Sequence, residues 1–424
     1  MAERDLDVVV FGATGVTGCR VAGYLAERCA GTEQTWAAAA RDLGKLDRKM
    51  AEDGVECPVS IVADLDDPDS LAAMASRAKV VLDLVGPYTL YGRPVIEACV
   101  ANGAHYMDLT GEMPFVRRVI EEFHDRAAEA GVKVVQVSGF EALPPDLAVA
   151  AAADKARERS GEALVSADCV VATKGMPAGL PRHTDVLSGG TMQSMVAVMD
   201  DEHAERALDP AALTLDPELA AEVRARSPIE LGPRLGSNGE VIAPMSPAAY
   251  INPAVIHRAN NLAAEGRGER PQPFRYREGI AIPGPTVTLP ARYAAAGAMS
   301  ATQAGFRAIA GSRRPRLRAG ASRAMSKVFP GSGFGPSGDR LEDWRWGLTV
   351  EAETTGGNAV TVELDADGHP GYLTTARMLA EAGLALAEPG ATPERAGCLT
   401  PATALGTGSM PRFERAGMRF AVSG

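Results

Sequence analysis

The sequence predicts an α/β fold whose first 150 residues form a doubly wound parallel sheet. Short apolar runs alternate there with segments of helical periodicity, and the first run leads into a glycine-rich turn. Such continuous apolar strands are typical of a parallel sheet covered by helices on both faces. The expected strands are 6–11, 36–40, 59–63, 80–85 and 132–137, and the expected helices are 18–30, 68–76, 94–102 and 114–130.

The rest of the 424-residue chain has a different rhythm, which indicates one or two further domains. Proline and glycine become frequent at 228–290 and 311–338, and this favours loops, lids and short strands. The segments 347–354 and 359–364 flank a glycine-rich turn and predict a β-hairpin. A helix is expected over 370–386.

The composition, 46% apolar and 23% charged, is that of a globular enzyme. A net charge of −11 argues against nucleic acid as a general partner. Six scattered cysteines without a Cys-x-x-Cys pair favour reduced thiols and no metal site. We expect no signal peptide and no membrane span, since the most apolar long stretch, 294–310, contains Gln303 and Arg307. A cytoplasmic protein is expected.

The glycine-rich turn has the spacing of a dinucleotide-binding loop. The strand at Val8–Phe11 runs directly into Gly12-x-x-Gly15-x-x-Gly18, and a helix is expected to follow. Gly12 permits the tight turn, Gly15 lets the backbone approach a pyrophosphate, and Gly18 lets the helix pack closely on the strand. The free N–H groups of the helix N-terminus then attract the phosphates. This context predicts a Rossmann domain.

The end of the second expected strand favours NADPH over NADH. An NAD site places an acidic residue there, whereas this chain has Ala39-Ala40-Arg41, followed by Lys45. Two cations suit the 2′-phosphate of NADPH. The alternative is that both are solvated residues at a helix start. Asp64, followed by Leu65, is placed to meet the adenine, or else to cap the next helix.

Ordered motifs then identify a family resemblance. They are Phe11 to Gly18, Gly86-Pro-Tyr-Thr-Leu-Tyr-Gly92, His105-Tyr-Met-Asp-Leu-Thr-Gly-Glu112 and Gly139-Phe-Glu-Ala-Leu-Pro-Pro-Asp-Leu147. Together they resemble the saccharopine dehydrogenase-like oxidoreductases. Ser188-Gly-Gly-Thr191 and Leu399 to Gly406 are similar to the branch of trans-acting enoyl reductases, which reduce a carbon–carbon double bond in a chain built by a separate synthase.

The resemblance implies a Rossmann domain (1–150), an inserted α+β substrate or lid domain (151–368) and a C-terminal helical segment (369–424) that packs back on the Rossmann domain. It implies an NADPH-dependent reductase acting on a polyketide or fatty-acyl intermediate. Two alternatives stay open: a C=N reductase of the saccharopine type, and a non-enzymatic NADPH-binding or lipid-associated protein of the same fold. The expected cofactor-binding residues are Gly12, Ala13, Thr14, Gly15, Val16, Thr17, Gly18, Arg41, Lys45, Asp64, Leu65, Gly86, Pro87 and Tyr88.

A hydride transfer also needs a proton donor or an anion-stabilising group. No tyrosine is followed by a lysine four residues later, so the Tyr-x-x-x-Lys pair of short-chain reductases is absent from the sequence. Tyr88 and Tyr91 follow the fourth expected strand, at the edge where ligands bind in such folds. His183, in a proline- and glycine-containing loop, is a third candidate. The alternatives are stacking for Tyr88, packing for Tyr91 and a surface position for His183. His105, Asp108 and Glu112 could relay a proton or serve the structure.

The stretch 279–338 contains no aspartate or glutamate but eight cations: Arg292, Arg307, Arg313, Arg314, Arg316, Arg318, Arg323 and Lys327. It predicts a docking surface, centred on Arg313–Arg318, for an acidic carrier protein, a CoA tail or an anionic membrane surface. The alternative is a solvated basic face that acidic helices elsewhere neutralise. Peripheral membrane association and a homodimer are further expectations.

Overall fold

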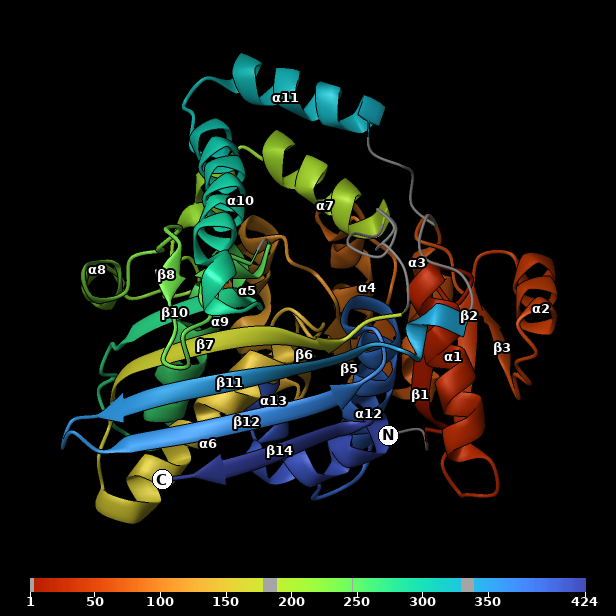
Figure 1. Ribbon diagram of the computed structural model, residues 1–424. Coiled ribbons are helices and arrows are strands. Elements are labelled where there is room, and N and C mark those ends of the chain that lie inside the picture. Colours follow the sequence, from red (N-terminus) through yellow and green to blue (C-terminus); the bar gives the residue numbers. More distant parts are fainter. Residues whose placement is uncertain (1–3, 178–188, 246, 329–338) are drawn as a thin grey trace.

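The computed structural model describes residues 4–177, 189–245, 247–328 and 339–424, and it contains two sheets side by side (Figure 1). The first sheet has the order β13-β6-β5-β4-β1-β2-β3, and all its strands pair in parallel. Its first part contains β1 (Leu6–Phe11), α1 (Val16–Cys29), β2 (Trp36–Ala40), α2 (Leu43–Glu52), β3 (Ser60–Val62), α3 (Pro68–Arg77), β4 (Ala78–Asp83), α4 (Tyr88–Asn102), β5 (His105–Asp108), α5 (Met113–Glu129), β6 (Lys133–Val135) and α6 (Leu143–Ser160). The expected doubly wound sheet is confirmed.

Alternating side chains of β1 enter two different cores, as a sheet covered on both faces requires. Val8 and Val10 pack in the core shared with α1 and α12, whereas Val9 and Phe11 pack in the core shared with α3, α4 and α5. The order of β3, β2, β1 and β4 reverses the winding between β1 and β4. Ligands of open α/β sheets bind at the carboxyl edge beside such a reversal.

The second sheet has the order β14-β12-β11-β7-β10-β9-β8 and mixes one parallel pair, β7 with β10, with antiparallel pairs. The expected hairpin is confirmed by β11 and β12. This part contains β7 (Leu164–Gly175), α7 (Gly189–Asp200), η2 (Ala204–Leu208), α8 (Pro217–Arg226), β8 (Arg234–Leu235), β9 (Val241–Ala243), α9 (Ala248–Gly266), β10 (Arg275–Ile282), η3 (Thr286–Thr288), α10 (Leu289–Ala310), α11 (Pro315–Val328), η4 (Asp339–Leu341), β11 (Arg345–Thr354) and β12 (Ala359–Asp367).

The C-terminal segment joins the two sheets. It contains η5 (Pro370–Thr374), α12 (Thr375–Ala387), β13 (Gly397–Leu399), α13 (Pro401–Leu405), η6 (Thr407–Ala416) and β14 (Met418–Ser423). As expected, α12 returns to the first sheet, where it packs on α1, β1 and β4. However, β14 pairs with β12 of the second sheet, and residue 150 lies inside α6. The expected domain bounds 1–150, 151–368 and 369–424 therefore do not coincide with the segments that form the two sheets.

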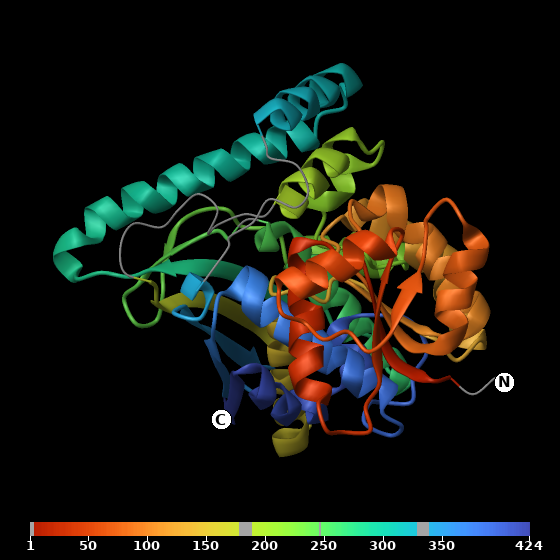
Figure 2. The same cartoon turned by 90° about the vertical axis from the view of Figure 1, so that its right-hand side faces the viewer.

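Figure 2 shows α10 extending along one side of the molecule, with α11 and α7 stacked near its C-terminal end. The expected apolar stretch 294–310 belongs to α10. Within the described residues, no helix is long and apolar enough to cross a membrane.

A buried ion cluster fixes α12 against α1. Glu381 of α12 is fully buried and accepts hydrogen bonds from the Tyr24 hydroxyl (2.9 Å) and from Nε of Arg28 (2.8 Å). Nε of Arg412 lies 3.4 Å from its other oxygen.

We expect Glu381→Gln to lower the free energy of unfolding by about 3 kcal/mol, because two arginines would lose the carboxylate that compensates for their partial burial. The matched control is Glu388→Gln: Glu388 also pairs with Arg412 but its side chain is 52% exposed, so its loss should cost less than about 1 kcal/mol. Urea unfolding of the two variants measures the difference. Equal losses would show that the Glu381 cluster does not fasten the C-terminal segment.

Candidate active site

The loop between β1 and α1 leaves room for a phosphate and none for side chains. Gly12 has a φ of +87°, and the N–H of Gly15 donates to its carbonyl oxygen at 3.0 Å. A Cβ atom on Gly18 would lie only 2.3 Å from that same oxygen, so the third glycine is required by the packing of helix on strand. No side chain caps the N-terminus of α1. Its N–H groups therefore remain available to an anion, and the loop fits a dinucleotide pyrophosphate.

At the end of β2 the exposed cations Arg41 and Lys45 have no ion-pair partner among the described residues. The neighbouring acid, Asp42, instead caps α2 by accepting the N–H of Lys45 at 2.9 Å. One oxygen of its carboxylate is thus engaged by the helix, and the two cations outnumber this one acid at the edge. This arrangement fits a 2′-phosphate.

In the turn after β3, the residue that caps α3 is Asp67. The Asp67 carboxylate accepts the N–H groups of Asp69 and Ser70 at the start of α3. Asp64 accepts the N–H of Asp66 at 3.1 Å and, like Leu65, is partly buried. The capping alternative for Asp64 is therefore wrong, since Asp67 caps α3, and contact with the adenine stays a prediction.

Two buried carboxyl groups end neighbouring strands at the carboxyl edge. The Tyr106 hydroxyl lies 3.1 Å from Asp83 and 3.0 Å from Asp108. Burial raises the pKa of Asp108 to about 7 and that of Asp83 well above its usual range. Asp108 also accepts the N–H of Thr110 and of Val137, so these acids serve the structure of the loops. His105, at the other end of β5, accepts the N–H of Lys133.

Glu112 caps α4 from the next loop along the edge. Its buried carboxylate accepts the N–H of Tyr88 (3.0 Å), the N–H of Thr89 (2.7 Å) and the hydroxyl of Ser194 on α7 (2.8 Å). The hydrogen bond from Ser194 connects α7 to the carboxyl edge of the first sheet. With its oxygens engaged by these donors, Glu112 has a positioning role.

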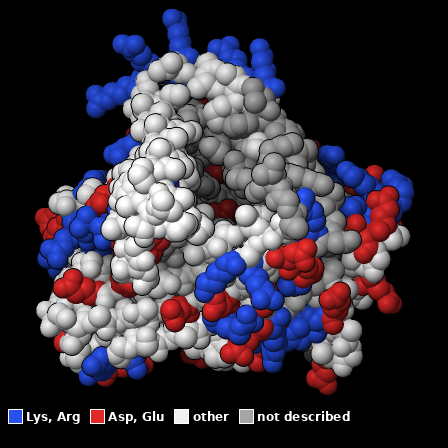
Figure 3. Space-filling model, viewed as in Figure 1, with Lys and Arg blue, Asp and Glu red and all other residues white. Residues whose placement is uncertain are grey.

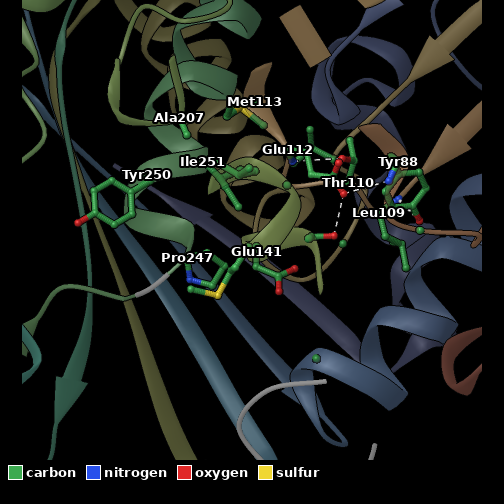
Figure 4. A pocket seen from close by; sticks show the side chains of 18 of the residues that line it. Tyr88, Leu109, Thr110, Glu112, Met113, Glu141, Ala207, Pro247, Tyr250 and Ile251 are labelled. Atoms are coloured by element: carbon green, nitrogen blue, oxygen red, sulfur yellow. Dashed lines mark hydrogen bonds between the residues drawn. The ribbon is translucent and has the colours of Figure 1, made fainter. Parts of the chain in front are cut away.

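A cavity of about 200 Å³ opens beside these loops (Figure 4). Thr17, Gly86 and Tyr88 line the side that belongs to the nucleotide-binding edge. The opposite wall comes from α7, η2, α10 and α9, including the residue that precedes α9. That wall is mainly apolar and aromatic: Met195, Val198, Ala207, Pro247, Tyr250, Ile251 and Phe306. No lysine or arginine is present among the described lining residues. An uncharged ligand fits this wall better than a polyanionic one.

Glu141 is the carboxylate in the cavity wall that the sequence did not single out. It belongs to the loop after β6, and Figure 4 shows its side chain among the lining residues. Burial raises the pKa of its carboxyl. The side-chain amide of Asn252 on α9 donates to its backbone carbonyl and, at 2.7 Å, to Glu278 of β10. This link holds the Glu141 loop against the second sheet.

The three predicted catalytic residues, Tyr88, Tyr91 and His183, differ in their position relative to the cavity. The Tyr88 ring lines the cavity, but its hydroxyl donates to the Asp83 carbonyl (3.1 Å) and accepts the Leu109 N–H (3.4 Å). Tyr91 is 40% exposed and does not line the cavity. For both, proton donation stays a prediction that this geometry does not favour. His183 lies outside the described residues. Within the described part of the chain, no group of three metal-binding side chains occurs.

We expect Arg41→Ala to weaken NADPH binding by about 1–3 kcal/mol, roughly 5- to 150-fold in Kd, through loss of the 2′-phosphate contact. NADH binding should be unchanged, because NADH lacks that phosphate. Arg77→Ala is the control: Arg77 pairs with Asp5 at the opposite edge of the sheet and should leave both affinities intact. Fluorescence titration of both cofactors measures the effect, and equal wild-type affinities for NADPH and NADH would refute it.

Comparison with known proteins identifies the family. The model described as the saccharopine dehydrogenase NADP binding domain matches residues 8–135. A Mycobacterium tuberculosis protein provisionally named a trans-acting enoyl reductase is 34% identical over 433 residues, which cover 98% of this chain and 97% of that protein. A trans-acting enoyl reductase of Mycobacterium bovis is 33% identical over 435 residues, with the same coverage. The Saccharomyces cerevisiae saccharopine dehydrogenase (L-Glu forming) shares the fold, with a TM-score of 0.51 at 14% identity over 98% of this chain and 99% of that one. The chain is an NADP-binding oxidoreductase, and it belongs to the saccharopine dehydrogenase-like family in its trans-acting enoyl reductase branch.

Proposed function

We propose that this enzyme uses NADPH to reduce a carbon–carbon double bond conjugated to the carbonyl of an acyl thioester. The observation that carries the proposal is the uncharged wall of the cavity beside Thr17 and Gly86, formed by residues such as Met195, Ile251 and Phe306. An acyl chain gains free energy when it leaves water for such a wall. The relatives named trans-acting enoyl reductases support the same reading.

The same wall disfavours the C=N alternative. A saccharopine-type substrate carries several carboxylates, which proteins recognise with arginine or lysine side chains. Among the described residues that line the cavity, neither type occurs, and the acids Glu112 and Glu141 lie there instead. Burying carboxylates of a substrate beside those two acids would be unfavourable.

The reduction consumes one hydride and one proton. The glycine loop and the carboxyl edge would hold NADPH, which would supply a hydride to the β-carbon of the unsaturated thioester. The electron pair of the double bond then becomes an enolate, whose α-carbon takes up the proton. We assign this proton to the Glu141 carboxyl, because it lines the cavity and its raised pKa favours the protonated form. The apolar wall excludes water from the enolate.

The substrate class is tested with two assays of NADPH oxidation on the wild-type enzyme. Crotonyl-N-acetylcysteamine should be reduced, whereas 2-oxoglutarate with lysine should give no rate above background. The reason is that only the first substrate matches an uncharged wall. The opposite preference would establish the imine reductase instead.

The proton donor is tested with Glu141→Gln. We expect kcat to fall by about 10²- to 10⁴-fold with NADPH affinity retained, since general acid catalysis is lost while the phosphate site is untouched. In the wild type, kcat should be full below the raised pKa of Glu141 and should fall as the pH rises through it. That alkaline limb should be missing from the variant. If Tyr88→Phe loses the rate while Glu141→Gln keeps it, the donor is Tyr88.

A further inference from the structure

The helices α10 and α11 carry the most one-sided charge distribution of the molecule. The sequence from 279 to 338 contains eight cations and no acid. In Figure 3, Lys and Arg atoms project from the top of the molecule, over α11, and the neighbouring surface over α10 is almost uncharged. Elsewhere on the surface the two signs are interspersed, as they are in the cluster of Arg93, Arg126, Glu97 and Glu122.

Two of the eight cations are structural. Arg292 is buried and donates to the carbonyl oxygens of Ile282 and Pro285. Arg318 is buried and donates to the carbonyl oxygens of Ser312 and Asp201. The expected surface Arg313–Arg318 is therefore corrected at its end, because Arg318 fastens α11 from beneath instead of facing outward.

The six other cations are exposed: Arg307, Arg313, Arg314, Arg316, Arg323 and Lys327. None of them has an ion-pair partner among the described residues, although twenty-five ion pairs occur in that part of the chain. Neutralisation by acidic helices, the alternative to docking, is thus not found there. Such a surface attracts anions over about 10 Å at 0.1 M salt.

This basic surface lies on the outside of the wall that encloses the cavity. Phe306 of α10 lines the cavity, while the next residue, Arg307, faces solvent. Met195 of α7 also lines the cavity, and α11 packs on α7. The hydroxyl of Ser322 on α11 donates to Asp200 at the end of α7. A partner bound to α11 would therefore lie next to the helices α7 and α10, which line the cavity.

The neighbouring face of α10 indicates what kind of partner fits. Apart from Arg307, its exposed positions between 291 and 308 are mostly alanine with glycine and threonine, and Met299 is its bulkiest exposed apolar side chain. Among the described side chains of α11, Leu317 is the one bulky apolar residue exposed beside the cations. A helix that binds a bilayer inserts bulky residues such as Trp, Phe and Leu. A flat face of small residues beside a row of cations suits the approach of an acidic protein surface better.

We propose that α10 and α11 dock an acidic carrier protein that delivers the acyl substrate as a thioester on its flexible arm. This inference rests on the proposed function, since it assigns the form in which that substrate arrives. The six cations supply long-range attraction and orientation. The helices α7 and α10 lie between the docked carrier and the cavity. The attraction raises the association rate and leaves the chemical step unchanged.

The test compares two triple variants of equal net charge. Arg313→Glu, Arg316→Glu and Arg323→Glu reverse the basic face of α11. The control reverses Arg159, Arg226 and Arg415, which are exposed and form no ion pair within the described residues. The substrates are a crotonyl chain on an acidic acyl carrier protein and the same chain on N-acetylcysteamine. Binding of the unloaded carrier protein and of phosphatidylglycerol vesicles is measured in parallel.

In the α11 variant we expect kcat/KM for the carrier-bound chain to fall at least about tenfold at 50 mM salt. The rate with the free thioester should stay within about twofold, and 0.5 M salt should reproduce the selective loss in the wild type. The control variant should behave as the wild type. If charge reversal lowers the melting temperature, the same three arginines are replaced by glutamine instead. That variant should show a smaller loss, again only with the carrier-bound chain.

Equal losses with both substrates, or no loss with either, would overturn the proposal. Binding of wild type to vesicles but not to the carrier protein would also overturn it, in favour of a membrane surface. If the wild type reduces neither substrate, the proposed function fails, whereas carrier binding that the α11 variant loses would still support docking.

Discussion

Buried carboxyl groups at the carboxyl edge of the first sheet hold together the loops from which the site is built. Asp108 accepts backbone N–H groups from the loops after β5 and β6, at Thr110 and Val137. The Tyr106 hydroxyl lies between Asp108 and Asp83 and can donate its one proton to only one of them. Burial raises the pKa of both acids, which favours a shared proton between them. Loops fixed in this way are preorganised before any ligand binds.

The acids at this edge differ in how many hydrogen bonds engage them, and this difference underlies the proposed role of Glu141. Glu112 is committed to the N-terminus of α4 and to Ser194, so it joins the second part of the chain to the edge. The backbone carbonyl of Glu141 accepts a hydrogen bond from Asn252, and its side chain lines the cavity. The Rossmann part supplies the cofactor loop and the acids, while α7, α9 and α10 supply the apolar wall. The basic face of α11 lies on the outside of that wall.

Local patterns predict the features that local residues decide. The glycine loop, the strands β1 and β2 and the hairpin all follow from spacing within a few turns or strands, whereas the return of α12 to the first sheet was implied by the family resemblance. The hydrogen bonds of Tyr88 and of the Glu141 loop do not follow from such spacing, because they depend on tertiary contacts with Leu109 and Asn252. The Tyr88 hydroxyl is occupied by the backbone of neighbouring strand ends, and the Glu141 loop is held by a residue of α9. A motif containing Glu141 was visible in the sequence, but its hydrogen bond with Asn252 of α9 was not.

In the proposed reaction, this edge reduces a conjugated carbon–carbon double bond with a hydride from NADPH and a proton from the protein. Isotope placement in the product tests it most directly. With crotonyl-N-acetylcysteamine, deuterium from NADPH that is deuterated at both C4 positions should appear at the β-carbon. In a separate reaction, deuterium from D₂O should appear at the α-carbon, as read by NMR of the isolated product. A product without cofactor deuterium at the β-carbon would contradict this mechanism. Transfer of cofactor deuterium only to the carbon of an imine, with 2-oxoglutarate and lysine as substrates, would contradict it as well.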